Sequence, residues 1–426
     1  MRLLSTKQLS NDEILACLRQ KSKKSEDITA AVQDIIQNVR KNGDLALAKL
    51  TEKFDGVRLK SIVVSDQEAQ QACRTVDAQL VNALKKAKQN IEKVTRAQMR
   101  AKEKTVRPAP GVSVWREFRP IERVGLYVPG GKAAYPSTVL MLGVPAAIAG
   151  CKKIILCTPP DTRGACNPAV LAAANLCGIS EIFKVGGAQA VAAMAYGTKT
   201  IPIIDKIFGP GNQYVTEAKK AVSNSIAIDM PAGPSEILII ADADAKPKWI
   251  AADCIAQLEH SQDAQAVVLT PSEQLAKSVI RAAKQQLKKS ERGEIVKKAL
   301  ARSSVIIVQS LKEACELANA YAPEHLEIIT PSPKNLAKKI LNAGSIFLGP
   351  YSPVALGDYV TGANHTLPTN AAARVYAGLS ADSFGKMVYL QKATRQGLKN
   401  LAAPTIAIAK QEGLTAHGKA ITIRTI

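Results

Sequence analysis

The 426-residue sequence predicts an α/β protein built on two doubly wound parallel sheets. Hydrophobic residues make up 46% of the chain but aromatic residues only 4%, which favours close-packed parallel strands and helices over a β-sandwich. From Val124 onwards, short β-rich runs alternate with helical spacers. Three of these runs end in glycine turns that lead into a helix, as expected of strand-to-helix turns in such sheets.

The first 107 residues are expected to be helical. Apolar residues recur at helical spacing in residues 31–50, where Gly43 marks an end, and a second amphipathic helix is expected over 81–100. Prolines and glycines from Pro108 to Pro120 then indicate a connector with short extended segments.

The β-rich runs define the expected strands, which are 124–128, 153–158, 182–185, 206–208, 236–241, 266–270, 305–308, 326–330 and 345–348. Two sheets are expected rather than one, because strongly twisted open sheets rarely exceed about ten strands. Pro231–Pro234 is the expected crossing between them. After about Ser380 the alternation stops, and helices followed by a short strand at 420–424 are expected. Such a short appendage buries little by itself, so it should pack on another domain or on a partner chain.

The composition also limits the class of function. The net charge is +21, but the lysines alternate with apolar residues as on solvated helix faces, and no arginine-rich run or zinc finger accompanies them. We therefore expect no nucleic-acid partner. The eight cysteines form no C-x-x-C pair, and no apolar run is long enough to span a bilayer. These features predict a cytoplasmic protein without a membrane partner.

The three glycine turns are candidate phosphate-binding sites. Glycines let the backbone approach a pyrophosphate, and the helix that follows offers unpaired N–H groups. None of the turns matches G-x-G-x-x-G, and the acidic residue expected about 20 positions later is absent. Ordinary turn chemistry therefore stays open as the alternative to a nucleotide site.

Histidine is scarce, which makes each one informative. The chain has four, at positions 260, 325, 365 and 417. Gln257 and His260 share one helix face, and Asp358 with two of the histidines could hold a divalent metal. Structural histidines remain the alternative, because spacing alone does not show that these residues converge.

Glu324 and His325 form the best acid–base candidate. Oxidation of an alcohol needs a base for the hydroxyl proton, and an imidazole is suited to this near neutral pH. Oxidation of the resulting aldehyde needs a nucleophile, either an activated water or a thiolate. Cys151 is the most loop-like thiol, but an inert buried cysteine is the better interpretation.

Six segments carry a recognisable pattern in a fixed order. They are Val124–Gly131, Val185–Ala190, Phe208–Asn212, Asp229–Glu236, Tyr321–Leu326 and Leu414–His417. Together they resemble the histidinol dehydrogenase family over nearly the whole chain. The resemblance implies oxidation of L-histidinol to L-histidine through a bound histidinaldehyde with two NAD+ in succession, one zinc ion per site, and a homodimer.

The resemblance also implies roles for individual residues. Glu324 matches the base that activates water in the second oxidation, and His325 matches the proton acceptor. The implied zinc ligands are Gln257, His260, Asp358 and His417. These ligands, together with Ser235, His325 and Glu412, match substrate contacts, whereas Tyr127, Gln189 and Asn212 match NAD contacts. His365 matches a position near the site but receives no role.

The resemblance further implies a division into domains. A small N-terminal and connector domain would comprise 1–25 with 107–126, and a Rossmann-like domain carrying the metal and catalytic residues would comprise 26–106 with 236–379. The second Rossmann-like domain, 127–235, would bind NAD. The tail 380–426 would make the dimer and place Glu412 and His417 in the partner's site. The runner-up is a paralogous zinc dehydrogenase of another small polar alcohol, such as a sulfonated diol.

Overall fold

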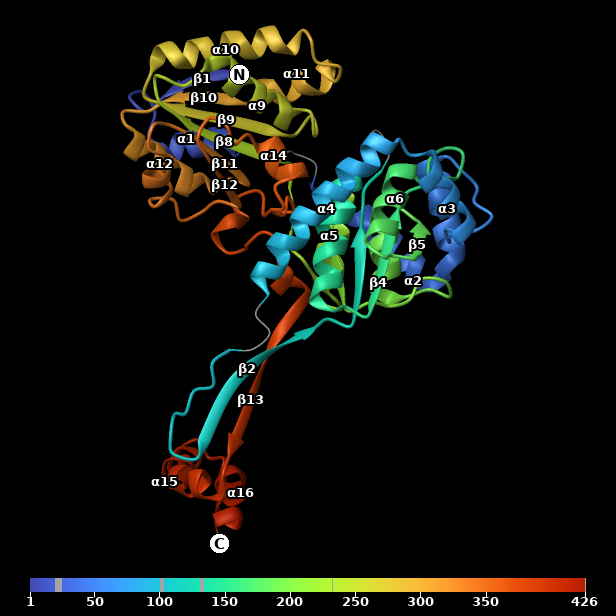
Figure 1. Cartoon of the computed structure of the whole chain (residues 1–426), viewed down its shortest axis with the longest axis vertical. Helices are drawn as coiled ribbons and strands as arrows, with labels where there is room; N and C mark the ends of the chain where they lie inside the picture. Colours follow the sequence, from blue (N-terminus) through green and yellow to red (C-terminus); the bar gives the residue numbers. More distant parts are fainter. Residues whose placement is uncertain (20–24, 100–102, 131–133, 232, 426) are drawn as a thin grey trace.

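The computed structural model describes residues 1–19, 25–99, 103–130, 134–231 and 233–425. Arg100, Gly131 and Ala232, which belong to predicted segments, lie outside the described residues. Two sheet-centred bodies lie side by side, and a long arm projects from them and carries the C-terminus at its far end (Figure 1). No helix in the described part of the chain is both long and apolar enough to cross a membrane.

The first body is built on a six-stranded sheet. Its strand order is β1-β10-β9-β8-β11-β12, and every described pairing is parallel. All six residues of β8 are buried, as a central strand covered on both faces requires. The strands are β1 (Arg2–Ser5), β8 (Glu236–Ala241), β9 (Gln265–Thr270), β10 (Ser304–Ile307), β11 (His325–Ile329) and β12 (Ser345–Leu348).

Helices cover both faces of this sheet. One apolar core joins the sheet to α9, α10 and α11, and another joins it to α1 and α12. The helices of this body are α1 (Asn11–Leu18), α9 (Pro247–Leu258), α10 (Glu273–Leu287), α11 (Gly293–Arg302), α12 (Leu311–Tyr321), α13 (Pro333–Ala337) and α14 (Val354–Tyr359).

The second body is built on a five-stranded parallel sheet with the order β5-β4-β3-β6-β7. Its strands are β3 (Arg123–Tyr127), β4 (Lys153–Thr158), β5 (Glu181–Lys184), β6 (Lys206–Phe208) and β7 (Ala227–Ile228). Apolar cores lie on both faces. The helices are α2 (Ser25–Asp55), α3 (Asp66–Thr75), α4 (Ala78–Gln98), α5 (Pro136–Ala149), α6 (Pro168–Leu176), α7 (Gly187–Tyr196) and α8 (Gln213–Val222).

Both sheets repeat one strand order. With β1 set aside, the first strand of each body lies at the centre, the second and third lie to one side, and the fourth and fifth lie to the other. The order therefore reverses between β3 and β6 in one body and between β8 and β11 in the other. Such a switch point opens a crevice at the sheet edge.

The predicted sheets are confirmed, since each of the nine expected strands coincides with an observed strand to within one residue at either end. Pro231–Pro234 does lie where the chain passes from β7 to β8. Gly43, at φ +51°, breaks the regular geometry of α2, but helix continues beyond it to Asp55.

The expected division into domains needs correction. Residues 1–25 do not join 107–126, because β1 adds to the six-stranded sheet beside β10. Residues 26–106 do not join 236–379, because α2, α3 and α4 pack on α7, α6 and α5 of the five-stranded body. Helical spacing shows that a helix has a buried face, but it does not say which sheet covers that face.

The arm is a two-stranded antiparallel ribbon that ends in two helices. Strand β2 (Val112–Pro120) pairs along its length with β13 (Gly385–Ala393), and α15 (Arg395–Gln411) packs on α16 (Thr415–Thr425). The expected strand at 420–424 is therefore wrong. Without a neighbouring strand to pair with, this segment satisfies its backbone within α16, which overrides the weak preference of its β-branched residues.

Candidate active site

The five-stranded body contributes the carboxyl edge of its sheet. Tyr127 ends β3, and Gly209 follows β6, which is its neighbour across the switch point. Gly209 has a φ of +125°, and a Cβ atom there would lie 2.0 Å from the carbonyl oxygen of Tyr127. Only glycine allows this approach of the two strand ends.

A buried ion pair holds this glycine turn in place. The Lys219 ammonium pairs with the Asp229 carboxylate, and both side chains are almost fully buried. Lys219 Nζ also donates to the carbonyl of Gly209 at 3.0 Å, while Asp229 Oδ2 accepts from the Gly209 N–H at 2.8 Å. Both backbone polar groups of Gly209 are thus engaged by one charged pair.

The three predicted cofactor residues lie at turns along this same edge. The hydroxyl oxygen of Tyr127 accepts from the Gly187 N–H at 3.1 Å, and burial raises the pKa of Tyr127 to about 12. Gln189 is buried in the first turn of α7, and Asn212 caps α8 by accepting from two backbone N–H groups. Tyr127 is therefore a neutral hydroxyl beside a helix N-terminus.

The six-stranded body contributes the opposite, amino edge of its sheet. Glu324 and His325 lie at the start of β11, and Ser235 immediately precedes β8. Glu324 Oε2 accepts from the Glu236 N–H at 2.9 Å, while His325 Nδ1 lies 3.2 Å from the carbonyl oxygen of Glu236. The backbone of one residue therefore orients both members of the predicted acid–base pair.

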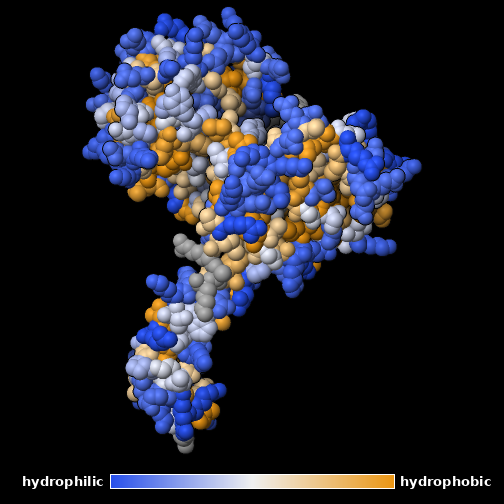
Figure 2. Space-filling view, viewed as in Figure 1, coloured by the Kyte–Doolittle hydropathy of each residue, from blue (hydrophilic) through white to orange (hydrophobic). Residues whose placement is uncertain are grey.

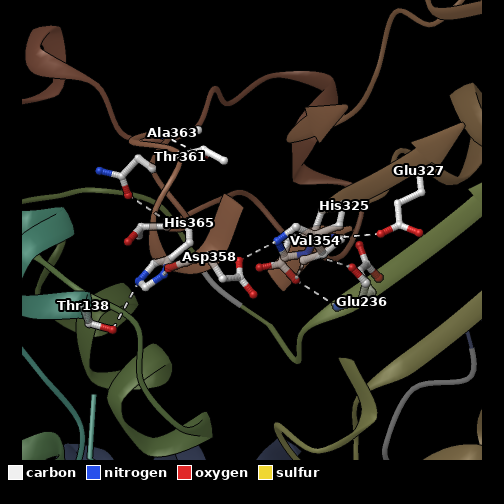
Figure 3. A network of polar contacts seen from close by, with 12 residues as sticks. Thr138, Glu236, His325, Glu327, Val354, Asp358, Thr361, Ala363 and His365 are labelled. Carbon is white, nitrogen blue, oxygen red and sulfur yellow. Dashed lines mark hydrogen bonds and ion pairs between the residues drawn. The ribbon is translucent and has the colours of Figure 1, made fainter. Parts of the chain in front are cut away.

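Two carboxylates flank the His325 imidazole (Figure 3). Its Nε2 lies 3.5 Å from Asp358 Oδ1, and its Nδ1 lies 3.5 Å from Glu324 Oε2. Burial alone would lower the pKa of His325, but the charges of Glu324 and Asp358 outweigh burial and raise that pKa. If Nδ1–H donates to the Glu236 carbonyl, Nε2 is left to exchange a proton on the Asp358 side.

The end of α9 brings Gln257 and His260 to the same region. Gln257 is buried, and its Nε2 atom has no hydrogen-bond partner among the described residues. His260 is exposed but close enough to act electrostatically on Asp358. Burial alone would raise the pKa of Asp358, yet His325, His365 and His260 together bring it below the ordinary value. Asp358 is therefore held as an anion.

A cavity of about 110 Å³ connects the two edges. Gly209 and Gly211 line it from the five-stranded body, and Ser235, Glu324 and His365 line it from the other. His365 also bridges the bodies, because its Nδ1 lies 2.8 Å from the Asp358 carbonyl and its Nε2 lies 3.2 Å from Thr138 Oγ1 on α5 (Figure 3). The residue that the sequence left without a role thus joins α14 to the five-stranded body.

The arm residues lie elsewhere. Glu412 caps the end of α15 and His417 lies on α16, and both are exposed. These two helices lie at the far end of the arm, away from both sheet-centred bodies (Figure 1). Within the described ranges, no three His, Cys, Asp or Glu side chains gather as a metal-binding group. One chain thus brings Ser235 and Glu324 to the cavity and His325 and His260 close to Asp358, with Gln257 one turn before His260 at the end of α9. It does not bring the two predicted tail residues there.

Cys151 lies at the wrong edge for the thiol alternative. It precedes β4, whereas the glycine turns follow β3, β5 and β6 at the carboxyl edge of the same sheet. Burial raises the pKa of Cys151 to about 12, and its thiol contacts the carbonyl of Phe384. A protonated thiol in that position cannot serve as the nucleophile for a substrate at the cavity.

Glu236, a buried carboxyl group beside the site, is not among the residues predicted from the sequence. It accepts from the Tyr321 hydroxyl at 2.9 Å and from the Asn370 N–H at 3.0 Å. Burial and the charge of Glu324 raise the pKa of Glu236 to about 7. A glutamate opening an otherwise apolar strand was the available signal, because glutamate is rarely buried without partners.

Known proteins resemble the chain over its whole length. The family model of histidinol dehydrogenase matches residues 18–425. The histidinol dehydrogenase of Vibrio parahaemolyticus is 49% identical over 100% of this chain and 98% of its own length. That of Xanthomonas campestris is 49% identical over 92% of each chain. The crystal structure of histidinol dehydrogenase from Elizabethkingia anophelis has a TM-score of 0.96 and 44% identity, covering 100% of this chain and 98% of that chain.

The chain is an oxidoreductase of the dehydrogenase class. Its two doubly wound sheets, its histidine–carboxylate site and these relatives agree on that class. This agrees with the prediction of an NAD-dependent enzyme. The chain belongs to the histidinol dehydrogenase family.

Proposed function

We propose that this chain oxidises L-histidinol to L-histidine in two steps through a bound histidinaldehyde and reduces one NAD+ in each step. The observation that carries the proposal is the Glu324–His325 pair, oriented by the Glu236 backbone beside a cavity that reaches the glycine turn at Gly209. An acid–base pair and a dinucleotide-type turn at one cavity are what stepwise hydride transfer needs.

NAD+ would bind along the carboxyl edge of the five-stranded sheet at the β3–β6 switch point. Tyr127, Gln189 and Asn212 all lie at turns on that edge, and the glycines leave room for a pyrophosphate to approach the backbone. When bound, NAD+ supplies the nicotinamide carbon that accepts hydride.

The donor set near α9 fits a zinc ion. Rotation of the Gln257 amide would place its carbonyl oxygen where Nε2, which has no partner among the described residues, now lies. Asp358, held as an anion, lies near His260 at the end of the same helix. Gln257, His260 and Asp358 would hold the ion, with His417 of a second chain as the fourth ligand. When bound, zinc supplies a Lewis acid that orients the substrate's nitrogen atoms and reduces the pull of Asp358 on a proton at His325.

In the first oxidation, His325 Nε2 would take the hydroxyl proton as hydride leaves the carbinol carbon for NAD+. The product is the aldehyde. In the second oxidation, Glu324 would take a proton from a water molecule, and the oxygen of that water would add to the aldehyde carbon. The hydrate then gives a second hydride to a second NAD+ and a further proton to solvent, which leaves the carboxylate.

The arm supports a homodimer in which each tail completes the other site. Among the 28 residues of α15 and α16, only Gly397, Ala409 and Gly418 are buried, which is too little for a stable unit. Leu401, Ile408, Leu414 and Ile423 are exposed there, and Figure 2 shows hydrophobic areas on the arm. A second chain would cover these side chains and receive Glu412 and His417. We place the enzyme in the cytoplasm, where reduced cysteines are expected.

A stoichiometric assay tests the proposal. Purified protein with histidinol, NAD+ and Zn2+ should yield two NADH for each histidine, and a chelator should remove both activity and bound zinc until zinc is restored. Reduction of NAD+ without formation of histidine would reject the proposal. Faster turnover of a sulfonated or simple diol than of histidinol would favour the paralogous dehydrogenase, which the relatives do not support.

A further inference from the structure

Two carboxyl groups meet inside the six-stranded body, behind the site. Glu327 of β11 is 2% exposed, and its Oε1 accepts at 2.8 Å from the N–H of Val354, the first residue of α14. Asp253 of α9 hydrogen-bonds to the Glu327 side chain. The group therefore ties α9, β11 and α14 together.

The two carboxyl groups share a proton. Glu327 Oε2 is buried and has no N–H or hydroxyl donor among the described residues, and a proton held between it and Asp253 would give it a partner. Burial and then the proximity of Asp253 raise the pKa of Glu327, and burial raises the pKa of Asp253. Two adjacent buried carboxylates cannot both ionise at low cost.

Each member of this group lies close along its own helix or strand to a residue of the proposed site, one turn away on a helix or two residues away on a strand. Asp253 is four residues before Gln257 on α9, so the two share a helix face. Glu327 is two residues after His325 on β11, so the two point to the same side of the sheet. Val354 is four residues before Asp358 on α14.

Figure 3 shows the same arrangement, with Glu327 bonded to Val354 on one side and His325 facing Asp358 on the other. Helix α14 has no side-chain cap of its own, so Glu327 supplies the acceptor for its first N–H. The three elements that carry the proposed site residues are thus joined at a single point next to the site.

We propose that Asp253, Glu327 and the Val354 N–H form a positioning cluster that sets the placement of Gln257, His325 and Asp358, and with it the affinity of the site for zinc. The inference rests on the proposed metal site. Groups behind a metal site orient its ligands, and their loss typically weakens metal binding by about 10- to 100-fold.

Matched substitutions separate the hydrogen bond from the mere presence of a side chain. Asp253→Leu and Glu327→Leu remove the bond and should weaken Zn2+ binding by about tenfold or more. Asp253→Asn and Glu327→Gln keep an amide donor for the partner carboxylate, so their Zn2+ affinity should stay within about threefold of the parent. The measurement is Zn2+ affinity of the metal-stripped, full-length protein in competition with a chromogenic chelator.

Ser303→Ala is the control for lost stability. It removes hydrogen bonds with the Ala266 N–H and the Ala299 carbonyl in the same body, beside β10, which lies three strands from β11. This variant should melt at a lower temperature with unchanged Zn2+ affinity. A loss of affinity in Ser303→Ala equal to that in the leucine variants would reduce the cluster to a general stabiliser and overturn the inference.

Val354→Pro covers the case in which the leucine variants do not fold. Proline is tolerated at the first position of a helix, so the change removes the N–H that donates to Glu327 Oε1 and leaves an apolar side chain of similar size in the core. Zn2+ affinity should fall by about threefold or more. Unchanged Zn2+ affinity in the folded variants would overturn the positioning role of the cluster and leave the proposed metal site standing. A parent protein that binds no Zn2+ would overturn the proposed metal site as well.

Discussion

The two sheets have the same strand order but contribute opposite edges to the site. The five-stranded sheet presents the carboxyl ends of β3 and β6, where ligands of doubly wound sheets ordinarily bind. The six-stranded sheet presents the amino ends of β8 and β11. Topology therefore locates the crevice at a switch point, but it does not decide which end of the sheet carries the chemistry.

The two edges also differ in the groups they offer. At the carboxyl edge the important atoms belong to the backbone, around Gly209 and the turns beside it. At the amino edge they belong to side chains, above all Glu324, His325 and Asp358. A substitution at the carboxyl edge should weaken binding of NAD+, and a substitution at the amino edge should stop the proton transfers of the reaction.

The largest expected effect is at the amino edge. Glu324→Gln keeps an oxygen to accept from the Glu236 N–H but has no base for water. Histidine formation should fall by about 1000-fold, because general base catalysis typically contributes about 10²- to 10⁴-fold. Histidine and NADH would be quantified together, with NADH still produced by the first oxidation. Undiminished histidine formation would exclude Glu324 as the base.

The next effect is at the carboxyl edge. Gly209→Ala places a methyl group 2.0 Å from the Tyr127 carbonyl, so the turn must move. The KM for NAD+ should rise by about tenfold or more, while KM for histidinol changes little, because about 1–3 kcal/mol of strain falls on the cofactor turn. Gly178→Ala is the matched control, since Gly178 also has a positive φ, at +73°, but open space where the Cβ atom would lie. Equal effects of the two substitutions on the KM for NAD+ would contradict this account.

A smaller effect concerns stability at the amino edge. Glu236 has its pKa raised to about 7, so the native state retains a proton that the unfolded state releases near pH 4.5. Native stability should therefore fall by about 3 kcal/mol as pH rises from about 4.5 to about 7. Glu236→Gln should lose that part of the pH dependence in urea denaturation. Identical slopes for the two proteins would show that Glu236 does not hold this proton.

The smallest effect is expected at the unused edge of the five-stranded sheet. Cys151→Ala should change kcat for histidinol oxidation by less than about twofold, because the thiol is protonated and precedes β4. Steady-state kinetics of the purified variant is the measurement. An inactive but folded variant would revive the thiol mechanism.

The strands could be predicted from sequence because each is a short apolar run, and most of these runs are bounded by glycine or proline. The partners of α2, α3 and α4 could not, since an apolar stripe does not name the sheet that buries it. Strands β1 and β13, which lie where helices were expected, also escaped prediction, because their partners β10 and β2 lie far along the chain.

The candidate site was predictable only in part. Glu324 with His325, and Gln257 with His260, are close in sequence and so signal a shared location. Glu236 and Glu327 lie within otherwise apolar strands. A glutamate in such a strand indicates a buried carboxyl group with polar partners, and neither residue was predicted on that ground. The place of Glu412 and His417 cannot follow from one chain, because the arm carries them away from that chain's own cavity.

Complementation between two inactive variants tests most directly whether the site is built from both edges and finished by another chain. Glu324→Gln impairs the body and His417→Ala impairs the tail, so each homodimer should fail to make histidine. Random mixed dimers should restore one intact site in each heterodimer, or about a quarter of wild-type activity in an equal mixture. A mixture no more active than its parents would contradict the account.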